Sequence, residues 1–67
     1  MKLTRYNELS KEAKKTAERF FPGEDIQGDS GINLYHYTED GYLIGDDTEY
    51  PLNEFNKRLK ESKGRIE

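Results

Sequence analysis

The sequence contains no cysteine, only one histidine and no long hydrophobic run. The absence of cysteine excludes disulfide bridges, thiolate metal sites and cysteine nucleophiles, and it agrees with a reducing compartment. No segment approaches the roughly 20 apolar residues that a transmembrane helix needs, and the first ten residues lack the apolar core of a signal peptide. We therefore expect a cytoplasmic protein that does not associate with membranes.

Hydrophobic residues are scarce. They make up 31% of the 67 residues, whereas charged residues make up 37%. Such values approach those of disordered chains, but the apolar residues fall in helix and strand periods, which favours one small folded domain over residues 1–67. A domain of this size buries only about 60% of the surface that its unfolded chain exposes. Because the core is thin, a homodimer that buries part of a tyrosine-bearing face is also allowed.

Basic residues are missing from the middle of the chain. Residues 20–56 hold nine Asp or Glu residues and no Lys or Arg. Residues 1–19 have six basic and three acidic side chains, and residues 57–67 have five basic and two acidic ones. A strongly acidic block therefore lies between two mildly basic ends.

The first segment has helical spacing and predicts a helix over about residues 10–21. Ser10 is the expected N-cap, because its hydroxyl can accept a hydrogen bond from a free amide in the first turn. Pro22-Gly23 ends the helix, and the Gly- and acid-rich residues 22–31 form a loop. One helical face carries Tyr6, Leu9, Ala13, Ala17 and Phe20.

Residues 32–50 predict a β-hairpin, because Asp40-Gly41 is a turn signal that needs positive φ. Two registers are open. A two-residue turn pairs Tyr37 with Ile44, whereas a three-residue turn with a bulge pairs Thr38 with Tyr42 and His36 with Ile44.

The alternation along the first strand places Ile32, Leu34 and His36 on one face. It places Tyr35 and Tyr37 on the other face. We expect a helix to cover the Ile32 face and the tyrosine face to be partly exposed. A third short strand around residues 48–52 is an alternative that Pro51 would confine to a sheet edge.

The last segment predicts a helix over about residues 52–63, with Asn53 as the N-cap or Pro51 at its start and Gly64 as its stop. The fold class is therefore α+β in the order α-β-β-α, in which an N-terminal and a C-terminal helix pack on a two- or three-stranded antiparallel sheet. The predicted core residues are Leu9, Ala13, Ala17, Phe20, Ile32, Leu34, Ile44, Leu52, Phe55 and Leu59.

Signs of catalysis or of a bound metal are weak. The chain has no nucleophile elbow, phosphate-binding glycine loop or paired-histidine motif. The run from Asp25 resembles the start of a calcium loop, but Ser30 replaces the glycine at its sixth position and His36 the glutamate at its twelfth. We therefore expect a non-enzymatic protein without a cofactor or a metal site.

Direct nucleic-acid binding by the hairpin is disfavoured. Tyrosines could stack on bases, but phosphate binding needs lysine or arginine beside them, and residues 20–56 have none. One alternative is a small nucleic-acid-binding module that uses the basic helix face of Lys11, Lys14, Lys15 and Arg19. Another is a structural or assembly subunit that forms a homo-oligomer.

The preferred hypothesis is a protein-binding surface on the hairpin. Tyrosine is enriched in interface hot spots, and surrounding carboxylates would steer the protein toward a basic, nucleic-acid-binding surface of a partner protein. The other interpretation is intramolecular, with the acidic block packed beside the basic helices. The predicted partner-binding residues are Tyr35, Tyr37, Glu39, Asp40, Tyr42, Asp46, Asp47 and Glu49.

In size, acidity and lack of cysteine, the chain resembles the small acidic proteins that phages encode to inhibit host machinery, such as anti-CRISPR or anti-restriction proteins. The resemblance is one of general character, because it includes no motif and assigns no residue. It implies an inhibitor that acts as a DNA mimic on its partner.

Overall fold

Within residues 3–67, the fold consists of three helices and a three-stranded antiparallel sheet, in the sheet order β1-β2-β3. The computed structural model describes residues 3–67. A single 3-10 turn, η1, follows the first strand. The elements are β1 (Thr4–Arg5), η1 (Tyr6–Glu8), α1 (Lys11–Glu18), α2 (Gly31–Leu34), β2 (His36–Tyr37), β3 (Leu43–Gly45) and α3 (Leu52–Ile66).

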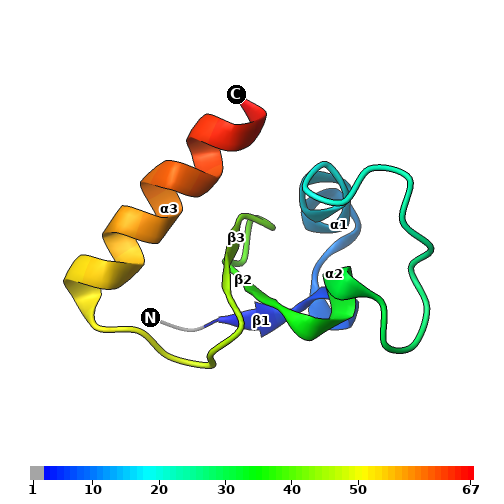
Figure 1. Ribbon diagram of the computed structural model, residues 1–67, viewed down its shortest axis with the longest axis horizontal. Coiled ribbons are helices and arrows are strands. Elements are labelled where there is room, and N and C mark those ends of the chain that lie inside the picture. The colour runs from blue at the N-terminus through cyan, green and yellow to red at the C-terminus, as the bar shows by residue number, and fades with distance from the viewer. Residues whose placement is uncertain (1–2) are drawn as a thin grey trace.

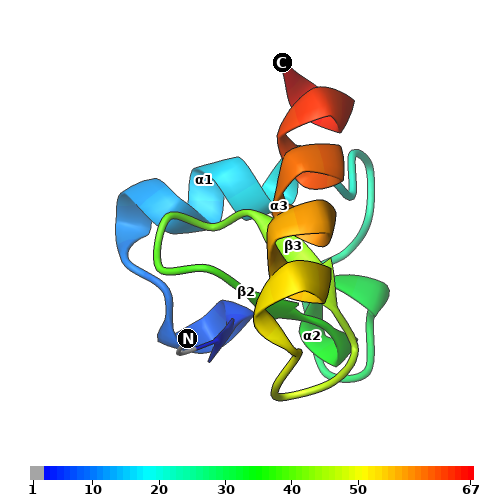
Figure 2. The same ribbon diagram turned by 90° about the vertical axis from the view of Figure 1, so that its left-hand side faces the viewer.

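The sheet lies between two helical layers (Figure 1). Helix α3 covers one side, and α1 and α2 lie on the other. The perpendicular view shows α3 in front of the strands and α1 behind them (Figure 2). The prediction of a small α+β protein is therefore confirmed, although its simple α-β-β-α order is not.

Helix α1 starts as the sequence predicts. The Ser10 hydroxyl accepts a 3.2 Å hydrogen bond from the Ala13 amide, which satisfies one of the free donors of the first turn. Ala13 and Ala17 are buried. The helix ends at Glu18, earlier than expected, and the amides of Phe20 and Phe21 close tight turns behind it.

The predicted hairpin is wrong in extent, because Gly31–Leu34 forms the short helix α2 and not a strand. Local polar groups satisfy its first turn. The Glu24 carboxylate accepts a hydrogen bond from the Gly31 amide, and the Asn33 amide donates to the Ser30 carbonyl at 2.9 Å. In a helix, Ile32 and Leu34 no longer share a face, so Ile32 is fully buried whereas Leu34 is 58% exposed.

The pairing of β2 with β3 matches neither predicted register completely. The Thr38 amide donates to the Tyr42 carbonyl at 3.0 Å, as the three-residue turn requires, and Gly41 has a φ of +92°. Tyr37 then pairs with Leu43, but a bulge shifts the pairing of His36 from Ile44 to Gly45.

Gly41 is fixed by its surroundings as well as by its φ. A Cβ at this position would collide with the carbonyl oxygen of Ala13 and would approach Thr16 Cβ at 3.1 Å. The β2–β3 turn therefore packs on the backbone of α1, as both views of the ribbon show (Figures 1 and 2).

The third strand comes from the N-terminal end of the chain and not from residues 48–52. Thr4 pairs with Tyr37 and Arg5 with His36. Since β1 precedes α1 along the chain, β2 becomes the central strand.

Helix α3 begins and ends differently from the prediction. Pro51 precedes its first residue and accepts a 2.8 Å hydrogen bond from the Phe55 amide, so Asn53 lies inside the helix and is not its cap. The helix continues through Gly64 to Ile66. A tertiary contact holds its last turn, because the Arg19 guanidinium donates to the Ile66 carbonyl at 2.5 Å.

The core contains two tyrosines that the predicted core omitted. Tyr37 is 0% exposed, and its hydroxyl donates a 2.6 Å hydrogen bond to the Ile32 carbonyl. The expectation of a partly exposed tyrosine face is therefore wrong for Tyr37. Leu34 and Leu52 were expected inside but lie at the surface, with Leu52 66% exposed, and Leu59 is half-buried. The main buried cluster is Tyr6, Leu9, Ala13, Ala17, Ile32 and Tyr37.

We predict that Gly41→Ala lowers the free energy of unfolding by at least about 1–3 kcal/mol, because it strains a positive φ and separates the turn from α1. Gly64→Ala is the matched control. Gly64 lies inside α3 with open space around it, so alanine should raise stability by about 0.5–1 kcal/mol. Urea denaturation measures both effects, and equal stabilities of the two variants would contradict the packing of the turn on α1.

The pKa of Tyr6 is raised to about 12 by burial and by Glu18. The Glu18 carboxylate accepts a 2.8 Å hydrogen bond from the Tyr6 phenol. Burial also raises the pKa of Tyr37. Above about pH 10, the unfolded chain releases phenol protons that the folded protein keeps. The contribution of the two phenols to stability should therefore be constant well below pH 10 and should fall as the pH rises above 10, with the part due to Tyr6 lost by about pH 12.

Thermal unfolding across this pH range tests the prediction with Tyr6→Phe, whose stability should fall less steeply. Glu18→Gln keeps a hydrogen-bond acceptor but removes the charge, so its loss of stability should end at a lower pH than in the wild type. An identical pH dependence for the wild type and Tyr6→Phe would show that the Tyr6 phenol is not coupled to folding.

Candidate functional site

The structure separates the predicted partner-binding residues into three surface regions and the core. The loop between β3 and α3 and the β2–β3 turn lie at opposite ends of β3 (Figure 2). Tyr35 lies apart from both, half-buried against Phe21 with 5.7 Å between the ring centroids. Tyr37 is in the core, where it offers no surface to a partner.

The β2–β3 turn carries Glu39 and Asp40, which are exposed, and Tyr42, which is half-buried. The Tyr42 hydroxyl donates to Glu67 at 3.1 Å, and this hydrogen bond is the main reason that the pKa of Tyr42 is raised. The Lys63 ammonium lies 5.3 Å from the ring centroid of Tyr42. This end of the sheet therefore combines acidic groups with a cation.

The second region is residues 46–49, which we name the acidic loop. Asp46, Asp47 and Glu49 place three carboxylates within four residues, and all four residues are exposed. The loop follows β3 directly and leads into Tyr50 and α3. Its position between a strand and a helix fixes both of its ends.

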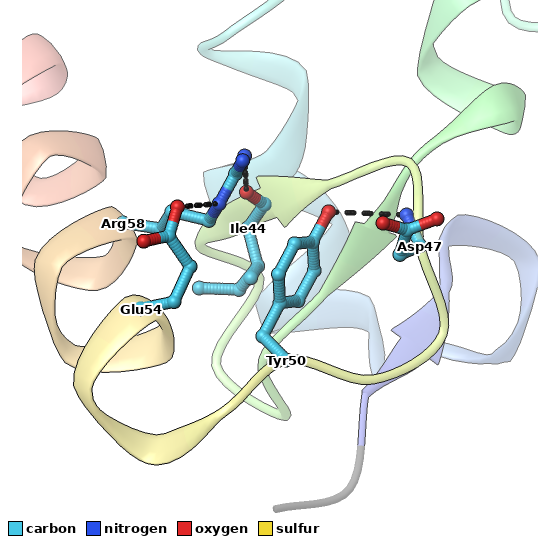
Figure 3. Close-up of polar contacts among 5 residues, drawn as sticks. All are labelled: Ile44, Asp47, Tyr50, Glu54 and Arg58. Carbon is cyan, nitrogen blue, oxygen red and sulfur yellow. Dashed lines mark hydrogen bonds and ion pairs between the residues drawn. The ribbon is translucent and has the colours of Figure 1, made fainter.

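A cluster of side chains holds the acidic loop against α3 (Figure 3). The Tyr50 hydroxyl accepts a 3.1 Å hydrogen bond from the Asp47 amide, inside the loop. The Arg58 guanidinium lies 4.5 Å from the centroid of the Tyr50 ring, within the range of a cation–π interaction. We name Gly45, Tyr50, Glu54 and Arg58 the Tyr50 anchor.

Arg58 makes two further contacts in the Tyr50 anchor (Figure 3). Its Nε is 3.0 Å from a Glu54 carboxylate oxygen, and its Nη1 donates to the Ile44 carbonyl at 3.3 Å. Gly45 makes room for the cluster, because a Cβ there would collide with the Tyr50 hydroxyl and would lie 3.0 Å from Arg58 Nη1.

The charge of the acidic loop is not neutralised by close ion pairs. Within residues 3–67, the pair of Arg58 with Glu54 is the one contact between oppositely charged side chains at 4.0 Å or less. The carboxylates of the loop are therefore exposed and have no cation within 4.0 Å in the described part of the chain. The intramolecular interpretation, in which the acidic block packs beside the basic helices, is met only in part, because α3 contacts Tyr50 and Ile44 through Arg58 without a close ion pair to the acids of the loop.

Sequence reasoning missed the Tyr50 anchor, although it identified all three acids of the loop. One signal was readable, because Glu54 and Arg58 are four residues apart, which is the spacing of a stabilising pair on a helix. The contacts of Arg58 with Tyr50 and Ile44 depend on how α3 packs on β3, and no local pattern specifies them.

Within residues 3–67, no group of three or more acidic or histidine side chains comes together as a metal site requires. None of the helices in that range combines the length and the apolar character needed to cross a membrane. Comparisons with protein-family models, with curated protein sequences and with solved structures found no match. The acidic loop and the Tyr50 anchor are therefore the features from which we infer function.

We predict that Tyr50→Phe loosens the acidic loop without unfolding the protein, because it removes the acceptor for the Asp47 amide. Hydrogen exchange at that amide should accelerate several-fold, in line with a net hydrogen-bond contribution of about 0.5–1.5 kcal/mol. Tyr35→Phe is the matched control, since the Tyr35 hydroxyl forms no hydrogen bond with the described part of the chain. Unchanged exchange in Tyr50→Phe would contradict the role of the anchor.

Proposed function

We propose that the protein is a non-enzymatic binding protein whose acidic loop docks on a basic surface of a partner protein. The supporting observation is that Asp46, Asp47 and Glu49 are exposed and make no ion pair within residues 3–67. Isolated surface salt bridges contribute only about 0–1 kcal/mol, so stability gives little reason to gather these charges. An interaction with an external cationic surface gives a reason to gather them.

The Tyr50 anchor supports the proposal because it orders the loop in advance. A loop that is already held by its Asp47 amide loses less conformational entropy when it binds. The carboxylates would act mainly on the association rate, since complementary charges steer diffusing partners together. The proposed interaction should therefore weaken as salt screens the charges.

A nucleic-acid-binding protein fits the proposed partner, because its surface is basic in order to contact phosphates. By occupying that surface with carboxylates, the protein would act as a DNA mimic and an inhibitor, in the manner of the phage-encoded proteins that it resembles in size and acidity. Glu39, Asp40 and Tyr42 form a secondary contact region at the other end of β3. Tyr35 can contribute only its exposed portion, and Tyr37 is excluded by its burial.

The test is affinity capture from an extract of the native host with three immobilised proteins. These are the wild type, Asp46→Lys/Asp47→Lys, and Asp25→Lys/Asp29→Lys as a control with the same change of charge in the exposed part of residues 22–31. We expect the wild type and the control to retain the same basic protein, and the loop variant to lose it. Association with the purified partner should slow by about 10-fold or more at low salt in the loop variant.

Retention of the same partner by the loop variant would contradict the proposal. A gel-shift assay distinguishes the rival nucleic-acid-binding module. For that function, the isolated protein must bind DNA or RNA. The variant Lys11→Gln/Lys15→Gln removes two exposed cations of α1 and should then abolish this binding.

A further inference from the structure

A cleft of about 300 Å³ lies along β3, between α3 and the side chains of Phe21 and Tyr35. All three residues of β3, Leu43 to Gly45, line it. The volume is at the small end of the range of ligand-binding pockets in proteins. The proposed docking function uses the acidic loop and leaves this cleft unassigned.

One wall of the cleft is apolar. The rings of Phe21 and Tyr35 are tilted by 33° at a centroid distance of 5.7 Å, and both side chains are half-buried. Leu43 is also half-buried beside them. These partly uncovered side chains can pack against an apolar body, preferably an aromatic ring.

The opposite wall, from α3, contains a buried hydroxyl without a partner. Ser62 is 3% exposed, and its Oγ has no hydrogen-bond partner in the described part of the chain. Buried polar groups in native proteins are almost always hydrogen-bonded. A serine in a helix can often satisfy its hydroxyl with a backbone carbonyl one turn earlier, but Ser62 does not. Because Ser62 also lines the cleft, a ligand bound there would supply the missing partner.

The cleft offers one cation to the negative charge of a ligand, Arg65, with the carboxylate of Glu61 also in the lining. Arg58 and Arg65 line it together with Glu61. Arg58 is already engaged by Glu54 and by the Ile44 carbonyl. Arg65 is exposed, lies 5.4 Å from the Phe20 ring centroid and forms no ion pair within residues 3–67, so its planar guanidinium is free to bind a carboxylate.

We propose that this cleft binds a small apolar monocarboxylate, about the size of an acylated aromatic amino acid. Its apolar body packs against Phe21, Tyr35 and Leu43. Its carboxylate binds Arg65, and the Ser62 hydroxyl donates a hydrogen bond to the ligand. The proposal does not depend on the function of the acidic loop.

The test uses N-acetyl-L-phenylalanine as the probe and N-acetyl-L-phenylalaninamide as its uncharged counterpart, in a titration followed by NMR chemical shifts of the backbone amides. The carboxylate should shift the amides of β3 and of α3 around Ser62, and the amide probe should bind about 10-fold more weakly or worse. Absence of binding at millimolar concentration, equal affinity of the two probes, or shifts confined to another surface would overturn the proposal.

Two variants with a matched control sharpen the test. Arg65→Gln should weaken binding of the carboxylate at least about 5-fold, whereas Lys63→Gln removes a cation of α3 that does not line the cleft and should leave the affinity unchanged. Equal losses of affinity in the two variants would show that Arg65 acts only through the net charge of the protein. That result would overturn the specific contact with Arg65.

Ser62→Ala separates a ligand-binding hydroxyl from a structural one. Because the hydroxyl has no internal partner, the variant should have an unchanged or higher melting temperature while it binds the carboxylate several-fold more weakly. A lower melting temperature with unchanged affinity would show that Ser62 serves the fold alone. Asp46→Lys/Asp47→Lys should bind the probe normally, so failure at the cleft and failure at the acidic loop are distinguishable.

Discussion

The hydrogen bond from the Tyr37 hydroxyl to the Ile32 carbonyl, 2.6 Å long and fully buried, is the constraint on which the packing depends. A phenol inside a core needs a polar partner. Helix α2 is only four residues long, so its carbonyls lack the partners that a longer helix would provide. The central strand and the short helix therefore satisfy each other, and Tyr6, Ala13 and Ala17 pack around this junction.

Tyrosines have a similar joining role elsewhere in the chain. Four of the five hydroxyls bond within the protein: Tyr6 to Glu18, Tyr37 to Ile32, Tyr42 to Glu67 and Tyr50 to the Asp47 amide. The first three bonds connect separate segments that a core with 31% hydrophobic residues would hold only weakly, whereas the bond of Tyr50 closes its own loop. Because the tyrosines are used internally, the outward-facing character of residues 32–50 comes mainly from their carboxylates.

Local sequence signals predicted correctly those features that depend on neighbouring residues alone. Ser10 caps α1, and Gly41 has the positive φ that its turn requires. Tertiary contacts override the pattern elsewhere. The alternation of Ile32 and Leu34 is typical of a strand, but Glu24, seven residues earlier, binds the Gly31 amide and supports a helix. Gly64 does not end α3, since Arg19 binds its last turn. The exposure of Asp46, Asp47 and Glu49 was predictable from their charge, but the sequence placed them in the hairpin, whereas β3 ends at Gly45 and residues 46–49 form a loop. The anchor of this loop depends on how α3 packs.

The contact of Arg58 with the Ile44 carbonyl has a consequence for self-association. Strand β3 is the last in the order β1-β2-β3, so its outer side is an edge at which a strand from another molecule could add. Arg58 donates a hydrogen bond to the backbone carbonyl of Ile44 and places a positive charge beside it. The Tyr50 side chain covers Gly45. An approaching strand meets a guanidinium and an aromatic ring in place of free backbone groups. The same cluster that holds the acidic loop thereby disfavours the addition of a strand at the β3 edge of the sheet.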